Sequence, residues 1–154
     1  GRVHFVRSLA AEVNCYEVEF GMKQEAWWKN LQPLRIRPCW ELVWNKLESL
    51  EPEDCKEDDA AWQFTFVQDI LYMRKQSGGQ MVHIDLGWYP DGDPDGSYRL
   101  VAILNDDWEN PILEFMSRRT CEIVETIEYW LFECIPTSQP VDEKSFRRRH
   151  PNKR

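Results

Sequence analysis

The chain has 154 residues, of which 42% are hydrophobic and 30% are charged, and its formal net charge is −8. This length corresponds to one domain of ordinary size, and the apolar fraction is sufficient for a core, which excludes a mainly disordered chain. The longest apolar runs, such as residues 100–104, are far below the roughly 20 residues needed to cross a bilayer. We therefore expect a folded domain without a membrane span.

The negative charge is concentrated in the body of the chain. Residues 143–154 hold six basic side chains and one acidic side chain, so the rest of the chain holds 26 acidic and 13 basic residues. An acidic surface repels the nucleic-acid backbone and steers basic proteins towards itself. We expect a basic protein partner and no direct binding of nucleic acid. The basic segment, residues 137–154, is expected to be a solvated tail.

The cysteines indicate a reducing compartment. Their number, five, is odd, and they form neither a Cys-x-x-Cys motif nor a Cys/His cluster at zinc-ligand spacing. This is typical of free thiols in a cytoplasmic protein. The N-terminus also lacks the basic and apolar pattern of a secretory signal, so we expect a cytoplasmic protein without bound metal or cofactor.

In the first half of the chain, the apolar pattern predicts two strands and one helix. Residues 16–20 alternate as a strand, and residues 1–21 are interpreted as an N-terminal extension or edge strand before a main domain at 22–136. Residues 40–45 predict a second strand, with Trp40, Leu42 and Trp44 on one side.

An acidic loop at residues 51–59 precedes the predicted helix. Apolar side chains recur at helical spacing and predict a helix over residues 60–76; these side chains are Trp62, Phe66, Ile70 and Met73. Asp58 or Asp59 is the expected N-cap of this helix, and the two glycines at 78–79 are expected to end it. The β-propensity of residues 64–67 argues against this helix.

The second half has a clearer pattern. Residues 81–89 and 98–104 predict a hairpin around a turn-rich loop at 90–96, and residues 111–116 predict a third strand after an acidic turn at 105–110. Residues 120–134 predict a helix with one apolar side. The order of elements indicates an α+β fold, an antiparallel β-meander with helices packed on one face.

Catalytic motifs are absent from the sequence. It contains no P-loop, no dinucleotide-binding glycine pattern, no Gly-x-Ser-x-Gly elbow and no His-Glu-x-x-His. Asp91, Asp93 and Asp95 imitate the start of an EF-hand loop, but Ala102 stands where the closing glutamate is required. A hairpin loop in which Gly92 and Gly96 permit positive φ explains the same residues. A small metal-dependent hydrolase that uses His83, Asp85 and residues 91–95 remains an alternative.

Several segments resemble one family. Residues 84–93 (IDLGWYPDGD), 98–100, 111–115 with Ser117-Arg118, and 123–131 (IVETIEYWL) are similar to small acidic immunity proteins of bacterial polymorphic toxin systems, including contact-dependent growth inhibition. Residues 34–38 and Trp40 fit the upstream part of the pattern. The likeness spans roughly residues 30–135, and its motifs are structural and not catalytic.

This resemblance implies a non-enzymatic protein that binds and neutralises a cognate toxin domain, often a nuclease. The acidic charge agrees, because a nuclease that grips phosphate is basic. A general acidic adaptor without a toxin partner is a further alternative. The expected partner-binding residues are carboxylates in three loops with three aromatic anchors, namely Glu53, Asp54, Glu57, Asp58, Asp59, Trp88, Tyr89, Asp91, Asp93, Asp95, Asp106, Asp107, Trp108 and Glu109.

Overall fold

The computed structural model describes residues 27–151, and the chain divides into one unit at residues 1–31 and a second at residues 32–154. In the first unit the described element is η1 (Trp27–Asn30), a single turn of 3₁₀ helix. The strand expected at residues 16–20 lies outside the described residues. The second unit holds the sheet and is described from here on.

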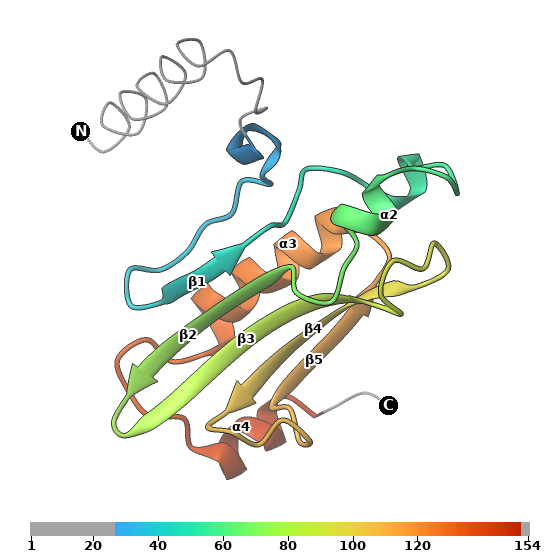
Figure 1. Cartoon of the computed structure of the whole chain (residues 1–154). Helices are drawn as coiled ribbons and strands as arrows, with labels where there is room; N and C mark the ends of the chain where they lie inside the picture. Colours follow the sequence, from blue (N-terminus) through green and yellow to red (C-terminus); the bar gives the residue numbers. More distant parts are fainter. Residues whose placement is uncertain (1–26, 152–154) are drawn as a thin grey trace, which may run out of the picture. The chain divides into compact units, whose positions relative to one another are not determined.

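The second unit is built on a five-stranded antiparallel sheet in which strand order follows chain order (Figure 1). The strands are β1 (Glu41–Asn45), β2 (Leu71–Ser77), β3 (Gln80–Tyr89), β4 (Ser97–Leu104) and β5 (Leu113–Ser117). The helical segments are η2 (Pro52–Asp54), α2 (Ala61–Phe64), α3 (Thr120–Tyr129), the π-helical turn η3 (Trp130–Cys134) and α4 (Glu143–Arg149). The predicted α+β meander is confirmed.

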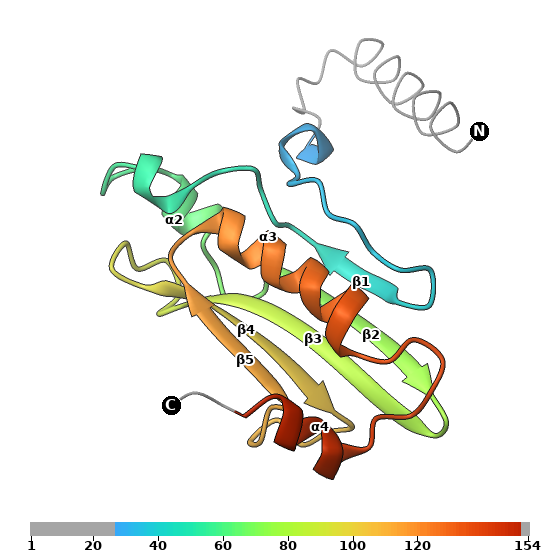
Figure 2. The same ribbon diagram turned by 180° about the vertical axis from the view of Figure 1, so that it is seen from behind.

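The core lies between the sheet and α3, which crosses one face of it (Figure 2). On that face β3 and β4 place Ile84 opposite Ala102 and Leu86 opposite Leu100, and all four are buried. Ile123 and Ile127 of α3 are fully buried in the same cluster. Burial of this apolar surface is the main favourable term that holds the helix against the sheet. We call the opposite side of the sheet the open face.

The helix predicted over residues 60–76 is wrong. Only Ala61–Phe64 is helical, and Leu71–Ser77 is strand β2. Gly78 and Gly79, expected to end that helix, instead form the two-residue turn between β2 and β3, with φ angles of 56° and 78°. Positive φ at both central residues is what a tight type I′ hairpin requires.

Strand β1 also differs from its prediction. A bulge interrupts its pairing, so that Leu42 pairs with Met73 and Trp44 with the adjacent residue Tyr72. Neighbouring residues of a strand point to opposite faces, so Leu42 and Trp44 do not share one side. Trp40 precedes the strand and is buried.

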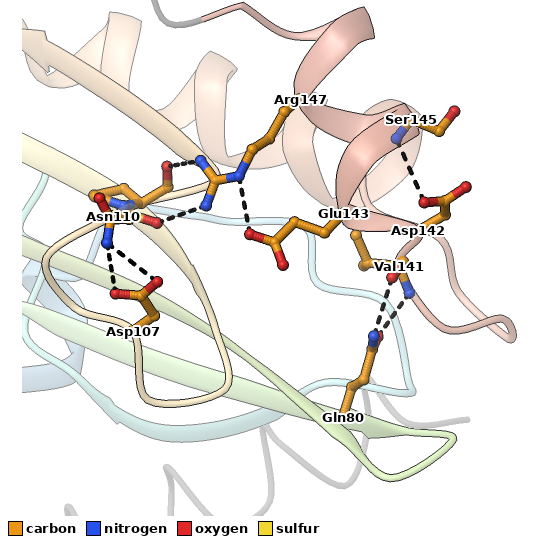
Figure 3. Close-up of polar contacts among 9 residues, drawn as sticks. Gln80, Asp107, Asn110, Val141, Asp142, Glu143, Ser145 and Arg147 are labelled. Atoms are coloured by element: carbon orange, nitrogen blue, oxygen red, sulfur yellow. Dashed lines mark hydrogen bonds and ion pairs between the residues drawn. The ribbon is translucent and has the colours of Figure 1, made fainter.

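The basic segment at residues 137–154 is not a solvated tail over its described part. Val141 and Phe146 are buried in the core, and Arg147 of α4 donates hydrogen bonds to the carbonyls of Asn110 and Pro111 at 3.0 and 3.1 Å (Figure 3). The side-chain amide of Gln80 pairs with both backbone groups of Val141. The segment therefore packs onto the β4–β5 loop and the β2–β3 turn.

No helix among the described residues is long and apolar enough to cross a membrane. The four cysteines of residues 27–151 are free thiols, as the sequence predicts; they are Cys39, Cys55, Cys121 and Cys134.

Candidate protein-binding surfaces

Two of the three acidic loops lie together. The loop at residues 51–59 leads into α2, and in the β3–β4 loop the Gly92 N–H donates to the carbonyl of Phe66, just after α2, at 2.9 Å. A Cβ on Gly92 would lie 2.8 Å from the carbonyl oxygen of Trp62, so this close approach requires glycine. We call residues 51–64 and 91–95 the acidic end.

Two buried tryptophans hold these loops from beneath. Trp62 donates its indole N–H to the carbonyl of Lys56 at 2.7 Å, and Trp88 donates to the carbonyl of Asp93 at 2.8 Å. Their ring centroids are 5.7 Å apart. The loops are therefore fixed to one aromatic core, although their residues are distant in sequence.

The predicted carboxylates of the acidic end are mostly exposed and form no ion pairs with other described residues. Within the described part of the chain, none of the eight expected carboxylates in these two loops forms an ion pair; they are Glu53, Asp54, Glu57, Asp58, Asp59, Asp91, Asp93 and Asp95. All except the half-buried Asp93 are exposed. Their field is therefore directed outwards, where it can attract a basic surface.

Some of these carboxylates also hold the loops in shape. Asp59 accepts a hydrogen bond from the Ala61 N–H, at the first residue of α2, at 3.0 Å. The N-cap position itself is Ala60, which has no side-chain cap, so the predicted N-cap at Asp58 or Asp59 is wrong. Asp91 accepts from the Gln68 N–H at 2.7 Å and Asp93 from the Asp95 N–H at 2.8 Å. Gly92 has φ of 68°, as predicted.

Gly96 is needed for a different reason from the one predicted. Its φ is not positive, but a Cβ there would lie 2.6 Å from the Trp88 indole nitrogen. The glycine makes room for the tryptophan that holds the loop.

The third acidic loop lies elsewhere. Asp106, Asp107 and Glu109 follow β4, whereas the acidic end precedes it, so the eight residues of that strand separate the two groups. At 3.4 Å per residue this distance is roughly 25 Å. All three residues are exposed, but the loop is tied to α4, because Asp107 accepts hydrogen bonds from Asn110 and Asn110 accepts one from Arg147 (Figure 3). The structure does not bring the predicted carboxylates onto one surface.

One of the predicted aromatic anchors is wrong. Trp88 is completely buried. Every second residue of this part of β3 points inwards, and Trp88 continues the series that begins with Ile84 and Leu86. Tyr89 and Trp108 are exposed, by 37% and 46%. Tyr89 ends β3 beside the acidic end, and Trp108 belongs to the distant third loop.

Phe64 is a candidate anchor that the sequence analysis missed. It belongs to α2 and is 73% exposed, the highest value among the exposed large apolar side chains of the described residues. The signal was present in the sequence, because Phe64 lies off the apolar stripe of the predicted helix. A phenyl ring among exposed carboxylates is a suitable contact for a protein partner.

His83 and Asp85 lie two residues apart on β3 and point to the open face. The Tyr72 hydroxyl is 2.6 Å from Nδ1 of His83, and Nε2 is buried without a hydrogen-bond partner. Burial lowers the pKa of His83. Burial and the nearby Asp69 raise the pKa of Asp85 to about 6, and Arg99 opposes this shift.

The ligand arrangement of the hydrolase alternative is not formed in residues 27–151. This part of the chain has no group of three or more His, Cys, Asp or Glu side chains placed to hold a metal ion. Asp91 and Asp93 are instead hydrogen-bonded within and beside their own loop.

Comparison with known proteins does not assign a family. The chain matches no protein-family model, and neither the curated proteins nor the solved structures gave a significant match.

Proposed function

We propose that this protein is a non-enzymatic immunity protein that binds a basic toxin domain, with a nuclease as the expected toxin class, in the cytoplasm. The observation that carries the proposal is the acidic end, which holds eight carboxylates without ion pairs in the described chain together with the exposed ring of Phe64. This surface has the charge of a nucleic-acid backbone and is fixed to a rigid core.

The two components of the surface have different physical roles. The carboxylates steer a basic partner and increase its association rate, an effect that salt screens. Phe64 supplies apolar area at the centre of the contact, where burial slows dissociation. A rigid surface also loses little conformational entropy on binding.

The proposal is tested by co-purifying the protein with the product of the adjacent gene and measuring nuclease activity with and without it. We expect a complex in which nuclease activity is lost. A complex without inhibition supports the adaptor alternative, and no binding to the adjacent product contradicts the proposal.

Two variants locate the interface in that complex. Phe64→Ala is expected to increase the dissociation rate, with an overall loss in affinity of about tenfold or more. The double variant Glu53→Gln/Glu57→Gln is expected to lower the association rate and its salt dependence.

Glu125→Gln/Glu133→Gln is the matched control, because it removes the same charge from exposed positions on α3 and η3. If both double variants slow association equally, the effect comes from net charge, and the acidic end is not the interface.

A further inference from the structure

Four aromatic rings form a continuous row across the open face. Trp44 of β1 lies 4.8 Å from Tyr72 of β2, Tyr72 lies 5.8 Å from His83 of β3, and His83 lies 5.3 Å from Trp108 of the β4–β5 loop, measured between ring centroids. We call these four residues the aromatic row. Three strands and one loop contribute to it, so it exists only in the folded sheet.

The two ends of the row are open to solvent. Trp44 is 38% exposed and Trp108 is 46% exposed, whereas Tyr72 is half-buried and His83 is 7% exposed. The Tyr72 hydroxyl and Nδ1 of His83 share a hydrogen bond, which fixes the middle of the row. The two indoles therefore extend from a rigid support, an arrangement typical of binding anchors.

The charges around the row are unbalanced. The two arginines of the open face are already paired, Arg74 with Glu41 at 2.7 Å and Arg99 with Glu114 at 2.6 Å. Asp69 and Asp85 form no ion pair among residues 27–151, and their mutual repulsion contributes to the raised pKa of Asp85. The open face thus has carboxylates available for an external cation.

Asp106 adds a further unmatched charge at the Trp108 end. Its side chain is 95% exposed, and its nearest cationic candidate is Nε2 of His83 at 3.8 Å. Burial lowers the pKa of His83, which favours the neutral imidazole. Among the described residues, Asp106 forms no other ion pair, and it shares its loop with the exposed indole of Trp108.

We propose that the aromatic row receives arginine side chains from a basic segment of a protein partner. A guanidinium group binds the face of a tryptophan ring and pairs with a carboxylate beside it, and this face offers both groups together. Only the identity of the partner rests on the proposed function; the arginine chemistry rests on the row. The row is a second contact surface, separate from the acidic end.

The probe is an eight-residue oligoarginine peptide, titrated into the full chain. The readout is the set of indole N–H signals in ¹H–¹⁵N spectra, assigned by substitution of each tryptophan. Trp44 and Trp108 are the reporters. Trp130 is the internal control, because it is buried in the core on the α3 side of the sheet. Trp62 and Trp88 donate to carbonyls of the acidic end, so they report binding of the peptide there.

We expect saturable shifts of the Trp44 and Trp108 signals and a stationary signal from Trp130. Trp108→Ala and Trp44→Leu are each expected to weaken peptide binding at the row about two- to fivefold, the range for an exposed cation–π contact. Tyr129→Ala is the matched control, since Tyr129 is an exposed aromatic on α3, on the other side of the sheet. It should leave the Trp44 and Trp108 titrations unchanged.

Other outcomes overturn the inference. Shifts confined to backbone signals of the acidic end place the peptide there and not on the row. A single-stranded oligonucleotide is the second probe. If it shifts the Trp44 and Trp108 signals and oligoarginine does not, the row binds nucleic-acid bases by stacking. Because the titration uses the peptide alone, its result is independent of whether the adjacent gene product binds.

Discussion

The carboxylate of Glu51 accepts a hydrogen bond from the backbone N–H of Thr120 at 2.8 Å, across 69 residues of chain. Its other oxygen accepts from the Cys121 N–H at 2.9 Å. The residue at the N-cap of α3, Arg119, provides no side-chain cap. Glu51 therefore takes the place of the cap and joins the first acidic loop to the start of α3.

Glu51→Ala is expected to lower the free energy of unfolding by about 1–2 kcal/mol, because two N–H groups at the positive end of α3 lose their acceptor. Urea denaturation measures the change. Glu53→Ala, at an exposed neighbouring position without a hydrogen bond of this kind, should change stability by less than about 0.5 kcal/mol. Equal effects of the two variants would show that the cap contributes nothing.

Phe146→Ala is expected to destabilise the protein by about 3–5 kcal/mol, because the ring is completely buried where α4 meets the core. Lys144→Ala, on the exposed side of the same helix, is the control. Thermal unfolding of both variants checks the difference. A small effect of Phe146→Ala would mean that the basic segment is a loosely attached tail.

The raised pKa of Asp85 makes the free energy of unfolding decrease as pH rises. Its pKa is raised from 3.8 to about 6, so the unfolded chain loses this proton at lower pH than the folded chain. The contribution of Asp85 to stability therefore falls as pH rises from about 4 to about 6 and stays low above that. Asp85→Asn should stabilise the protein at pH 7 by about 1–2 kcal/mol, a value reduced for partial exposure.

The measurement is urea denaturation of the wild type and Asp85→Asn at pH 4 and pH 7. The difference between them should be small at pH 4 and largest at pH 7. Glu109→Gln, at an exposed position, should follow the wild type. A carboxyl-carbon titration by NMR gives the pKa of Asp85 directly, and a value near 4 would contradict the prediction.

Gly87→Ala tests the packing of the segment before β2 against β3, where Ile70 and Val67 bond to the backbone of Leu86 and Trp88. A Cβ at Gly87 would lie 2.1 Å from the carbonyl oxygen of Gln68, which is backbone and cannot rotate away. We expect a loss of stability of about 2–3 kcal/mol by overpacking. Gly79→Ala meets no atom within 4 Å but has φ of 78°, so it should cost only about 1 kcal/mol. Chemical denaturation of both variants ranks the two effects.

The sequence predicted the second half of the fold well, because its strands and helix obey simple periodicity. Ile84, Leu86 and Trp88 alternate inwards on β3, and Ile123 and Ile127 recur at helical spacing on α3. Strand β2 was missed for a physical reason. Its inward positions are Leu71, Met73 and Lys75, and the buried lysine breaks the apolar alternation.

Lys75 is accommodated by contacts that only the folded chain reveals. Its ammonium group donates to the carbonyls of Pro136 and Thr137, just beyond the end of η3. A cation is favourable at the carboxyl end of a helix, which offsets part of the cost of burial. Burial lowers the pKa of Lys75. No local pattern encodes a partner that lies 61 residues away.

The candidate surfaces were predictable only in part. Composition identified the carboxylates, but which loops meet depends on tertiary packing: α2 brings residues 51–59 and 91–95 together, whereas β4 separates them from residues 106–109. The aromatic row was invisible in the sequence, because Trp44, Tyr72 and His83 come from three strands.

Strand order that follows chain order has a consequence for how the sheet forms. Each strand pairs with its neighbour in sequence, and the β2–β3 and β3–β4 hairpins close over short turns. Closing short loops costs little chain entropy, so these hairpins can assemble early and quickly. The Glu51–Thr120 link and the docking of α4 close much longer loops. Amide protons in β3, the central strand of this sheet, should therefore exchange last under native conditions.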